Sequence, residues 1–232
     1  MIEIDKTDIV GISSAIRGMR NPMNSWCKSD SYICDELVHI DVCRDCELFL
    51  GEETEGDTYY CADVFIGEND LSLMKKLSNA GTDHRKFMRM ITVYADITAP
   101  LYWYKEYDTY KVGTVANSCS TMHKIHSKEF TLDDFSCEHL AADSELLLLE
   151  TIKLLNEYRE DYISTKDKLF WWQMIQLLPS SYNQKRTVML NYEVLSNIYK
   201  SRKAHKLDEW VEFCKWIETL PYSELITNKE NK

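Results

Sequence analysis

The sequence has few of the residues that interrupt regular structure, with seven glycines and four prolines among 232 residues. That scarcity leaves little room for long loops, and no internal repeat or low-complexity tract is present. No apolar run approaches the roughly 18–20 residues that span a bilayer. The first ten residues, MIEIDKTDIV, lack the cationic region of a secretory signal. We therefore expect a cytoplasmic protein without membrane association, in which the eight cysteines are mostly reduced.

Positive charge is also scarce, because 27 Lys and Arg stand against 38 Asp and Glu and give a net charge of −11. A general nucleic-acid binder needs a basic face that displaces counterions from phosphates, so the balance argues against that class. It still allows one small phosphorylated ligand held by a few local cations. An acidic interaction or inhibitor protein would also fit the charge, although a solvated surface explains the spread carboxylates more simply.

Several catalytic motifs are missing. There is no Gly-x-Gly-x-x-Gly sequence and no Walker-type loop, which excludes ordinary Rossmann and P-loop chemistry. There is also no Gly-x-Ser-x-Gly nucleophile elbow.

The spacing of the possible metal ligands also gives little support for a metal site. One Cys-x-x-Cys pair is present, which is half of a zinc site, and the second tight pair is missing; the cysteines concerned are Cys34, Cys43, Cys46 and Cys61. Structural cysteines are the favoured interpretation, with a zinc knuckle as the alternative. His123 and His126 would share a face only in a helix, and no Glu-x-x-His motif accompanies them. We expect no metal site.

Hydrophobic periodicity is what the sequence does have, in a chain that is 44% apolar and can bury a large core. A helical period predicts helices over residues 7–19, 71–80, 101–112, 144–162, 166–178, 193–202 and 207–220. Alternation predicts strands within residues 31–66, 87–97 and 186–192. Residues 113–123 fit neither pattern. Helix ends are expected at Asn69 or Asp70, at a Ser164–Asp167 capping box, and at Gly81. The sequence thus predicts an α+β fold, a helix-rich single domain over residues 1–232 with a central sheet.

Cations and hydroxyl groups gather between residues 81 and 126, against the acidic trend. They are His84, Arg85, Lys86, Arg89, Lys105, Lys111, Thr114, Asn117, Ser118, Ser120, Thr121, His123 and Lys124. The small residues of GTVANSCST allow close approach of a ligand, and hydroxyl and amide groups can bond phosphate oxygens and base edges. One or two of the five aromatic residues between 102 and 110 could stack on a planar ring. An amphipathic helix followed by a polar loop fits the same composition without any ligand.

The order of elements around this stretch resembles the flavin-dependent thymidylate synthases (thymidylate synthase complementing proteins). In that family a helix ends in Gly and a His-containing turn, a strand ends in Ala-Pro, and Arg-Gln, Arg-His-Arg and Ser-x-Asn-Glu-x-Ser motifs follow. Here Gly81, His84 and Phe87 precede a strand that ends at Ala99-Pro100. A second similar patch contains Leu178-Pro179, Thr187, Asn191, Leu195 and Arg202. The resemblance covers residues 70–226, and residues 1–66 are a divergent, β-rich N-terminal part.

The family's cationic motifs are altered in this chain. Lys105-Glu106 stands in place of Arg-Gln, and Thr109-Tyr110-Lys111 in place of Arg-His-Arg. Lysine lacks the bidentate fork with which arginine holds a phosphate. Cys119 stands where the family has Ser, and a one-residue insertion would restore Asn117 and Ser120 to facing a ligand.

The resemblance implies two sets of binding residues and leaves the catalytic residues unknown. The cofactor-binding set is His84, Arg85, Tyr110, Lys111, Asn117 and Asn191. The substrate-binding set is Lys105, Glu106, Ser120, His123, Lys124 and Arg202.

The activity that the resemblance implies is reductive methylation of a pyrimidine nucleotide, dUMP to dTMP, or a related nucleotide modification. FAD is the implied cofactor, NADPH and methylene-folate are the implied co-substrates, and a homotetramer is the implied assembly. A non-catalytic nucleotide-binding protein on the same scaffold is the main alternative, because the phosphate-binding motifs are weakened.

Overall fold

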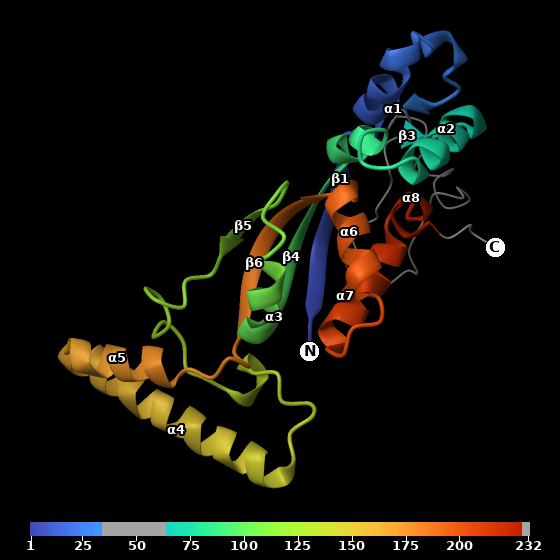
Figure 1. Cartoon of the computed structure of the whole chain (residues 1–232). Coiled ribbons are helices and arrows are strands. Elements are labelled where there is room, and N and C mark those ends of the chain that lie inside the picture. The colour runs from blue at the N-terminus through green and yellow to red at the C-terminus, as the bar shows by residue number, and fades with distance from the viewer. Residues whose placement is uncertain (34–63, 229–232) are drawn as a thin grey trace, which may run out of the picture. The chain divides into compact units, whose positions relative to one another are not determined.

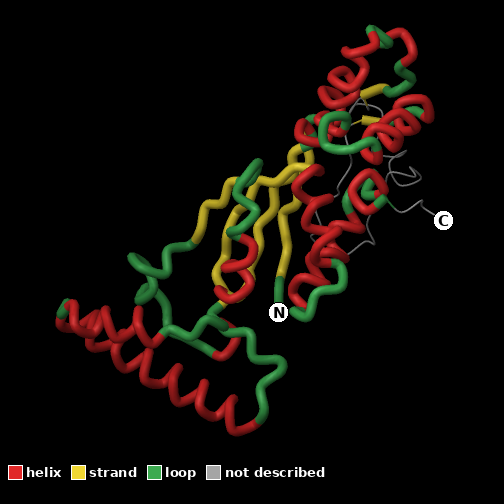
Figure 2. The backbone as a smooth tube through the Cα atoms, in the orientation of Figure 1, coloured by secondary structure: helices red, strands yellow, loops and turns green. Residues whose placement is uncertain are grey.

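The computed structural model describes residues 1–33 and 64–228. Its main sheet has four strands in the order β1-β4-β6-β5, which are Glu3–Val10, Thr92–Pro100, Asn183–Asn191 and Val115–Ser118 (Figure 1). Burial alternates along β4, where Val93, Ala95, Ile97 and Ala99 point into the core. Helices account for much of the remaining chain, as the tube in Figure 2 shows. The predicted α+β class with a central sheet is therefore confirmed.

The chain divides into two compact units, and the boundary between them falls within each of the four strands. The first contains Met1–Glu3, Ile97–Thr109 and Ala116–Thr187, and the second contains Ile4–Asp96, Tyr110–Val115 and Val188–Lys232. Each unit is described below by itself.

The first unit has a helical hairpin made of α4 (Ala142–Thr165) and α5 (Lys168–Leu177), besides the short helices α3 (Leu101–Tyr107) and η6 (Leu132–Asp134). Its core is formed by Ile125, Phe130, Phe135, Leu148, Ile152, Leu155 and Met174. The helix α5 begins at Asp167, whose carboxylate accepts from the Leu169 N–H at 2.9 Å. The expected Ser164 cap is wrong, because Ser164 lies in the last turn of α4 and its hydroxyl donates to the Asp161 carbonyl.

The second unit contains the remaining helices and a small two-stranded sheet. These are α1 (Ile12–Arg20), η1 (Asn21–Met23), η2 (Trp26–Lys28), β2 (Tyr32–Ile33), β3 (Val64–Phe65), α2 (Glu68–Asn79), η5 (Arg85–Met90), α6 (Tyr192–Arg202), α7 (Asp208–Thr219) and α8 (Glu224–Thr227). Strands β2 and β3 pair antiparallel, with Tyr32 opposite Phe65. The core includes the fully buried side chains of Leu195, Ile198, Trp210, Phe213 and Leu225.

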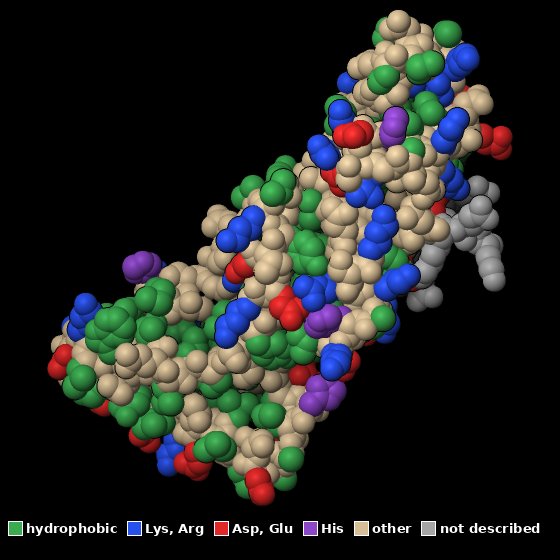
Figure 3. Space-filling model, in the orientation of Figure 1, with side chains coloured by type: hydrophobic (Ala, Val, Ile, Leu, Met, Phe, Trp, Pro, Cys, Tyr) green, Lys and Arg blue, Asp and Glu red, His purple; other side chains and the backbone are tan. Residues whose placement is uncertain are grey.

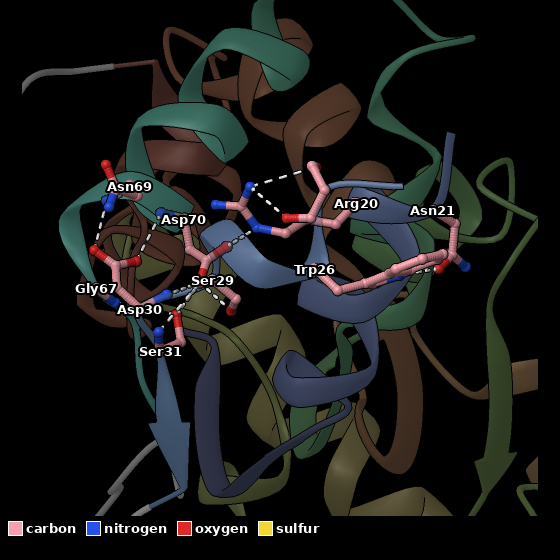
Figure 4. A network of polar contacts seen from close by, with 10 residues as sticks. Arg20, Asn21, Trp26, Ser29, Asp30, Ser31, Gly67, Asn69 and Asp70 are labelled. Atoms are coloured by element: carbon pink, nitrogen blue, oxygen red, sulfur yellow. Dashed lines mark hydrogen bonds and ion pairs between the residues drawn. The ribbon is translucent and has the colours of Figure 1, made fainter. Parts of the chain in front are cut away.

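A buried polar network joins α1, residues 29–31 and the start of α2 (Figure 4). The Arg20 Nε atom lies 2.6 Å from Asp70 Oδ1. The other Asp70 oxygen accepts from the Ser29 and Ser31 hydroxyls at 2.6 and 2.7 Å, and from the backbone N–H groups of Asp30 and Ser31. We call these five residues the Asp70 network.

The N-terminus of α2 is capped by this network rather than by its own first residues. The Asp30 carboxylate accepts from the backbone N–H groups of Asn69 and Asp70 at 2.9 and 3.1 Å. The expected capping by Asn69 or Asp70 is therefore wrong, because the Asp70 side chain points to Arg20 instead. Gly67 permits this close approach, since a Cβ atom there would lie 2.2 Å from the Asp30 carboxyl carbon.

Three predicted element boundaries also differ. The first helix begins at Ile12 and not at residue 7, because residues 3–10 pair in the main sheet. The helix predicted over residues 101–112 ends at Tyr107, and Gly113 has a positive φ of 78° in the following turn. Residues 115–118, expected to be irregular, form the edge strand β5. In each case sheet pairing or a turn overrides the local hydrophobic period.

The helices of the described part, residues 1–33 and 64–228, include none that is long and apolar enough to cross a membrane. The cysteines Cys34, Cys43, Cys46 and Cys61 lie outside the described residues.

Candidate functional site

Helix α3 of the first unit is held by its aromatic face. Trp103, Tyr104 and Tyr107 are each at most 2% exposed, and the Trp103 and Tyr107 rings stack with centroids 5.0 Å apart. The Tyr104 hydroxyl donates to the Ile97 carbonyl at 2.7 Å. Burial raises the pKa of Tyr104 well above its usual value, so this phenol stays protonated. Most of the aromatic residues expected here are thus packing residues.

The polar side chains of α3 are left at the surface. Lys105 is exposed, and Glu106 is partly exposed. Lys105 and Lys111, both expected in one helix over residues 101–112, do not share a helix, because α3 ends at Tyr107. Lys111 belongs instead to the second unit.

Arg186 of β6, which the sequence did not single out, connects α3 to the segment after β5. Its guanidinium carbon lies 3.7 Å from the centroid of the Tyr104 ring. Its Nη1 atom bonds Asp108 Oδ1 at 2.7 Å, and its Nε atom donates to Gln184 Oε1 at 2.9 Å. Gln184 in turn donates to the Cys119 carbonyl at 2.6 Å. We call these five residues the Arg186 network.

The predicted ligand residues between 117 and 124 follow this network along the chain. Asn117, Ser120, His123 and Lys124 are all exposed. The Ser120 hydroxyl accepts from the His123 N–H at 2.9 Å, and it therefore closes a turn as well as facing solvent. The exposed amide, hydroxyl, imidazole and ammonium groups form a donor-rich strip that suits an anionic ligand.

His126 does not join that strip as a metal ligand. The segment that contains His123 and His126 consists of turns, so the predicted shared helical face is absent. The His126 ring packs edge-on against Tyr162, with centroids 4.9 Å apart. Burial, followed by the charges of Lys166, Lys124 and Arg159, lowers the pKa of His126. Within the described part of the chain, no group of three or more His, Cys, Asp or Glu residues could hold a metal ion.

The second unit brings two predicted residues, Tyr110 and Arg202, into direct contact. The Arg202 Nε atom donates to the Tyr110 hydroxyl at 3.0 Å. The same guanidinium lies 5.0 Å from the centroid of Trp210 and 5.8 Å from that of Tyr110. Residues 92 positions apart in the sequence thus form a cation held by aromatic rings, at the C-terminal end of α6.

Asn191 anchors the other end of the same segment. Its side-chain oxygen accepts from the Val194 N–H at 3.0 Å and caps α6, and its amide lies 3.4 Å from the Gly113 carbonyl. A Cβ atom at Gly113 would approach this amide to 2.7 Å, so glycine is required there for space as well as for its φ. Lys111 is exposed on the turn that these contacts fix.

Arg85, which is predicted to bind the cofactor, is buried and paired within the second unit. It is 8% exposed, its Nε atom lies 3.2 Å from Glu193 Oε1, and its Nη2 atom donates to Asn197. Arg89 also pairs with Glu193. Burial raises the pKa of Glu193, but the hydrogen bonds and charges of Arg89 and Arg85 outweigh burial and lower it overall. The other residue of this loop in the predicted binding sets, His84, immediately precedes η5 (Arg85–Met90) and is exposed.

The twelve predicted binding residues are therefore divided equally between the two units. The first unit contains Lys105, Glu106, Asn117, Ser120, His123 and Lys124, and the second contains His84, Arg85, Tyr110, Lys111, Asn191 and Arg202. The substrate-binding prediction thus falls in the first unit except for Arg202, and the cofactor-binding prediction falls in the second except for Asn117.

The sequence matches no protein-family model and no curated protein sequence. Solved structures, however, share the fold. The flavin-dependent thymidylate synthase ThyX from Helicobacter pylori, solved with FAD and dUMP, aligns over 97% of both chains with a TM-score of 0.63 and 13% identity. This chain has the fold of a flavin-dependent thymidylate synthase. A second structure of the Helicobacter pylori enzyme, also with FAD and dUMP, aligns over 98% of this chain and 97% of its own with the same score and identity.

A nucleotide methylase also shares this fold over part of the chain. The UMP/dUMP methylase PolB from Streptomyces cacaoi, solved with 5-Br UMP, covers 71% of this chain and 84% of its own at a TM-score of 0.50 and 12% identity. The resemblance seen in residues 70–226 is therefore confirmed at the level of fold, and it extends further along the chain than the sequence motifs indicated.

Proposed function

We propose that the protein binds a pyrimidine nucleoside monophosphate and FAD, and that it methylates the nucleotide reductively, as dUMP to dTMP or in a related modification. The observation that carries the proposal is the shared fold over 97% of the chain with a ThyX structure that holds FAD and dUMP. The PolB structure, from a UMP/dUMP methylase, supports pyrimidine nucleotides as the substrate class.

The donor set of the second unit fits a flavin cofactor in its chemistry. Exposed Lys111 and His84 can meet phosphate oxygens, and Tyr110 offers an aromatic ring whose hydroxyl accepts a hydrogen bond from Arg202. Arg85 contributes less to this set, since Glu193 already balances its charge. When bound, the flavin supplies the reducing chemistry, and the residues of this chain hold and orient it.

The nucleotide phosphate and base are assigned mainly to the first unit. Lys124 and His123 supply donors for a phosphate, and Ser120 supplies a hydroxyl group for a base edge or a sugar. Arg202 of the second unit stays in this substrate set, and Asn117 stays in the cofactor set. Lys105 and Glu106 complete the assignment from α3. Methylene-folate and NADPH are the proposed co-substrates.

Absorbance and calorimetry test this proposal directly. Added FAD is expected to give a bound flavin band, dUMP or UMP to bind the FAD-loaded protein, and dTMP or methylated UMP to form with methylene-folate and NADPH. Lys111→Gln should weaken FAD binding about tenfold, because one charge-assisted contact contributes about 1.5–3 kcal/mol. Lys76→Gln, an exposed lysine of α2, is the matched control. A wild-type protein that binds neither FAD nor nucleotide would contradict the proposal.

A non-catalytic nucleotide-binding protein is the second candidate. It is favoured by Thr109-Tyr110-Lys111, which stands where the family has Arg-His-Arg, because a single lysine replaces two bidentate arginines. Nucleotide binding without product formation, in the presence of FAD, methylene-folate and NADPH, would select this candidate over the enzyme.

The proposed assembly is a homotetramer, as the family resemblance implies. The α4–α5 hairpin exposes Leu146, Leu147, Leu169 and Trp172 by 42–70%, and apolar side chains gather over it in Figure 3. Soluble monomers rarely expose large contiguous apolar patches. Analytical ultracentrifugation should give a tetramer for the wild type and smaller species for Leu147→Glu. Met23→Glu, an exposed apolar residue of the other unit, should leave the assembly intact. A monomeric wild type would refute the assembly.

A further inference from the structure

Arg186 occupies an unusual place for a strand arginine. Its side chain is only 12% exposed, and its guanidinium carbon lies over the Tyr104 ring, 3.7 Å from the ring centroid. Tyr104 is itself 1% exposed and fixed by its bond to the Ile97 carbonyl. The arginine therefore stacks on a rigid support, which restricts the direction in which its donors can point.

The donors of Arg186 reach the end of α3 on one side. Asp108 is the residue that ends this helix, and its carboxylate accepts from Nη1 at 2.7 Å. A negative charge at a helix C-terminus is unfavourable to the helix dipole, so helix stability does not explain an aspartate here. The contact with Arg186 does explain the aspartate, because this contact fixes the end of α3, three residues after Lys105.

On the other side the donors of Arg186 reach the segment after β5 through one intermediate. The Nε atom orients the Gln184 amide at 2.9 Å, and that amide donates to the Cys119 carbonyl at 2.6 Å. The Cys119 N–H donates to the Lys185 carbonyl at 2.9 Å, so this residue is held at both its backbone groups. Ser120 and the exposed residues up to Lys124 continue directly from it.

We propose that Arg186 is a positioning residue for nucleotide binding, which sets the spacing between α3 and the segment 119–124 through Asp108 and Gln184. The inference rests on the proposed function, and it adds a residue outside both predicted binding sets. Lysine cannot replace Arg186, because an ammonium group cannot stack on Tyr104 and bond two separate acceptors in fixed directions.

Calorimetry of dUMP binding to the full-length, FAD-loaded protein tests the inference. Arg186→Gln is expected to raise the dissociation constant for dUMP about tenfold, while the number of binding sites per chain stays unchanged. Arg186→Lys should raise this dissociation constant nearly as much. FAD binding, assigned mainly to the second unit, should change by less than about twofold. Arg17→Gln removes the same charge from an arginine that bonds within its own helix α1, and it should bind dUMP as the wild type does.

The site number separates positioning from a merely structural role. If Arg186 only stabilised the fold, Arg186→Gln would lower the number of competent sites and leave their dissociation constant unchanged, which overturns the inference. Asp108→Asn keeps the test available should Arg186→Gln fail to fold. It is expected to weaken dUMP binding about threefold because the contact loses its charge, and combining the two substitutions should add little to Arg186→Gln alone, because both act on the same contact.

The outcome for the wild type keeps this inference distinct from the proposed function. Wild-type binding of dUMP with an unchanged dissociation constant in Arg186→Gln, Arg186→Lys and Asp108→Asn would refute the role of Arg186 and leave the proposed function standing. A wild type that binds no pyrimidine nucleotide would refute both.

Discussion

The Asp70 network and the Arg186 network are both built on an arginine–carboxylate pair, and they differ in how completely the pair is enclosed. Asp70 is fully buried, and Arg20 is 5% exposed at the side chain. In the Arg186 network the carboxylate of Asp108 is 53% exposed, and the arginine divides its remaining contacts between a ring and an amide. The five hydrogen bonds that the buried Asp70 carboxylate accepts indicate a structural role. The second ends beside exposed polar residues, which is what a binding surface requires.

Asp70→Ala should have the largest effect on stability. The substitution leaves the Arg20 charge, two hydroxyls and two backbone N–H groups without their buried acceptor. Removing one partner of a buried pair typically costs about 3–5 kcal/mol of unfolding free energy. Urea denaturation of the variant measures this loss. Asp8→Ala, which replaces an exposed aspartate of β1, should cost less than about 0.5 kcal/mol. Equal losses in Asp70→Ala and Asp8→Ala would contradict a structural role of the Asp70 network.

Acid should reduce the contribution of Asp70. Burial raises the pKa of Asp70, but the hydrogen bonds from Ser29, Ser31 and Arg20 together outweigh burial and bring the pKa below its usual value of 3.8. A carboxyl whose folded pKa is depressed stabilises the fold above its unfolded pKa, and it loses that contribution as the pH falls through the folded pKa. The stability gap between wild type and Asp70→Ala is therefore expected to be constant above about pH 5 and to narrow below about pH 4. A gap that stays constant down to pH 2 would show that ionisation of Asp70 contributes nothing.

The same networks show how far the fold could be predicted from the sequence. Helices 144–162, 193–202 and 207–220 were found because their apolar period and, for α6, the Asn191 cap are local. The strand at residues 3–10 was missed because its placement depends on distant contacts. One example is the hydrogen bond from the Trp216 indole to Thr7, 209 residues away. The Asp30 cap was missed for the same reason, since it lies 39 residues before Asn69.

Arg186→Gln should cause the second-largest loss of unfolding free energy. It removes a hydrogen bond to a charged partner and a ring contact, and such bonds contribute about 1.5–3 kcal/mol when buried. Because solvent screens the half-exposed Asp108, we expect a loss of about 1–2 kcal/mol, clearly below that of Asp70→Ala. Urea denaturation under the same conditions makes the two variants comparable. A loss of unfolding free energy as large as that of Asp70→Ala would indicate that both networks have a structural role.

The candidate site was predictable only where a family motif marked it. Tyr110 and Arg202 were chosen by their positions in the two similar patches, and the structure joins them. Arg85 was chosen in the same way, although its partner Glu193 could not be foreseen, since the sequence does not indicate which carboxylate folds against it. Arg186 was missed because a polar residue in a predicted alternating strand is expected to face solvent, and its partners Gln184 and Asp108 lie outside that predicted strand.

Asp30→Ala should cost less than either change above. It removes the side-chain cap of α2 while Asp70 keeps its contact with Arg20, and losing an N-cap typically costs about 1 kcal/mol. Asp30→Asn has a single amide oxygen, so it can still accept one of the two N–H bonds and should recover part of the loss. If the asparagine variant is as unstable as the alanine variant, one cap bond is not enough and both carboxylate oxygens are required.

Asp108→Asn should have the smallest effect on stability and is the most informative comparison with Asp70. Exposed ion pairs contribute about 0.2–1 kcal/mol, and asparagine retains an oxygen that can accept from Arg186. We expect a loss below about 0.5 kcal/mol by urea denaturation. The same variant is expected to weaken dUMP binding, so binding and stability separate in the Arg186 network. A carboxylate whose removal affects the ligand more than the fold lies at a binding surface, whereas one whose removal unfolds the chain, as at Asp70, belongs to the core.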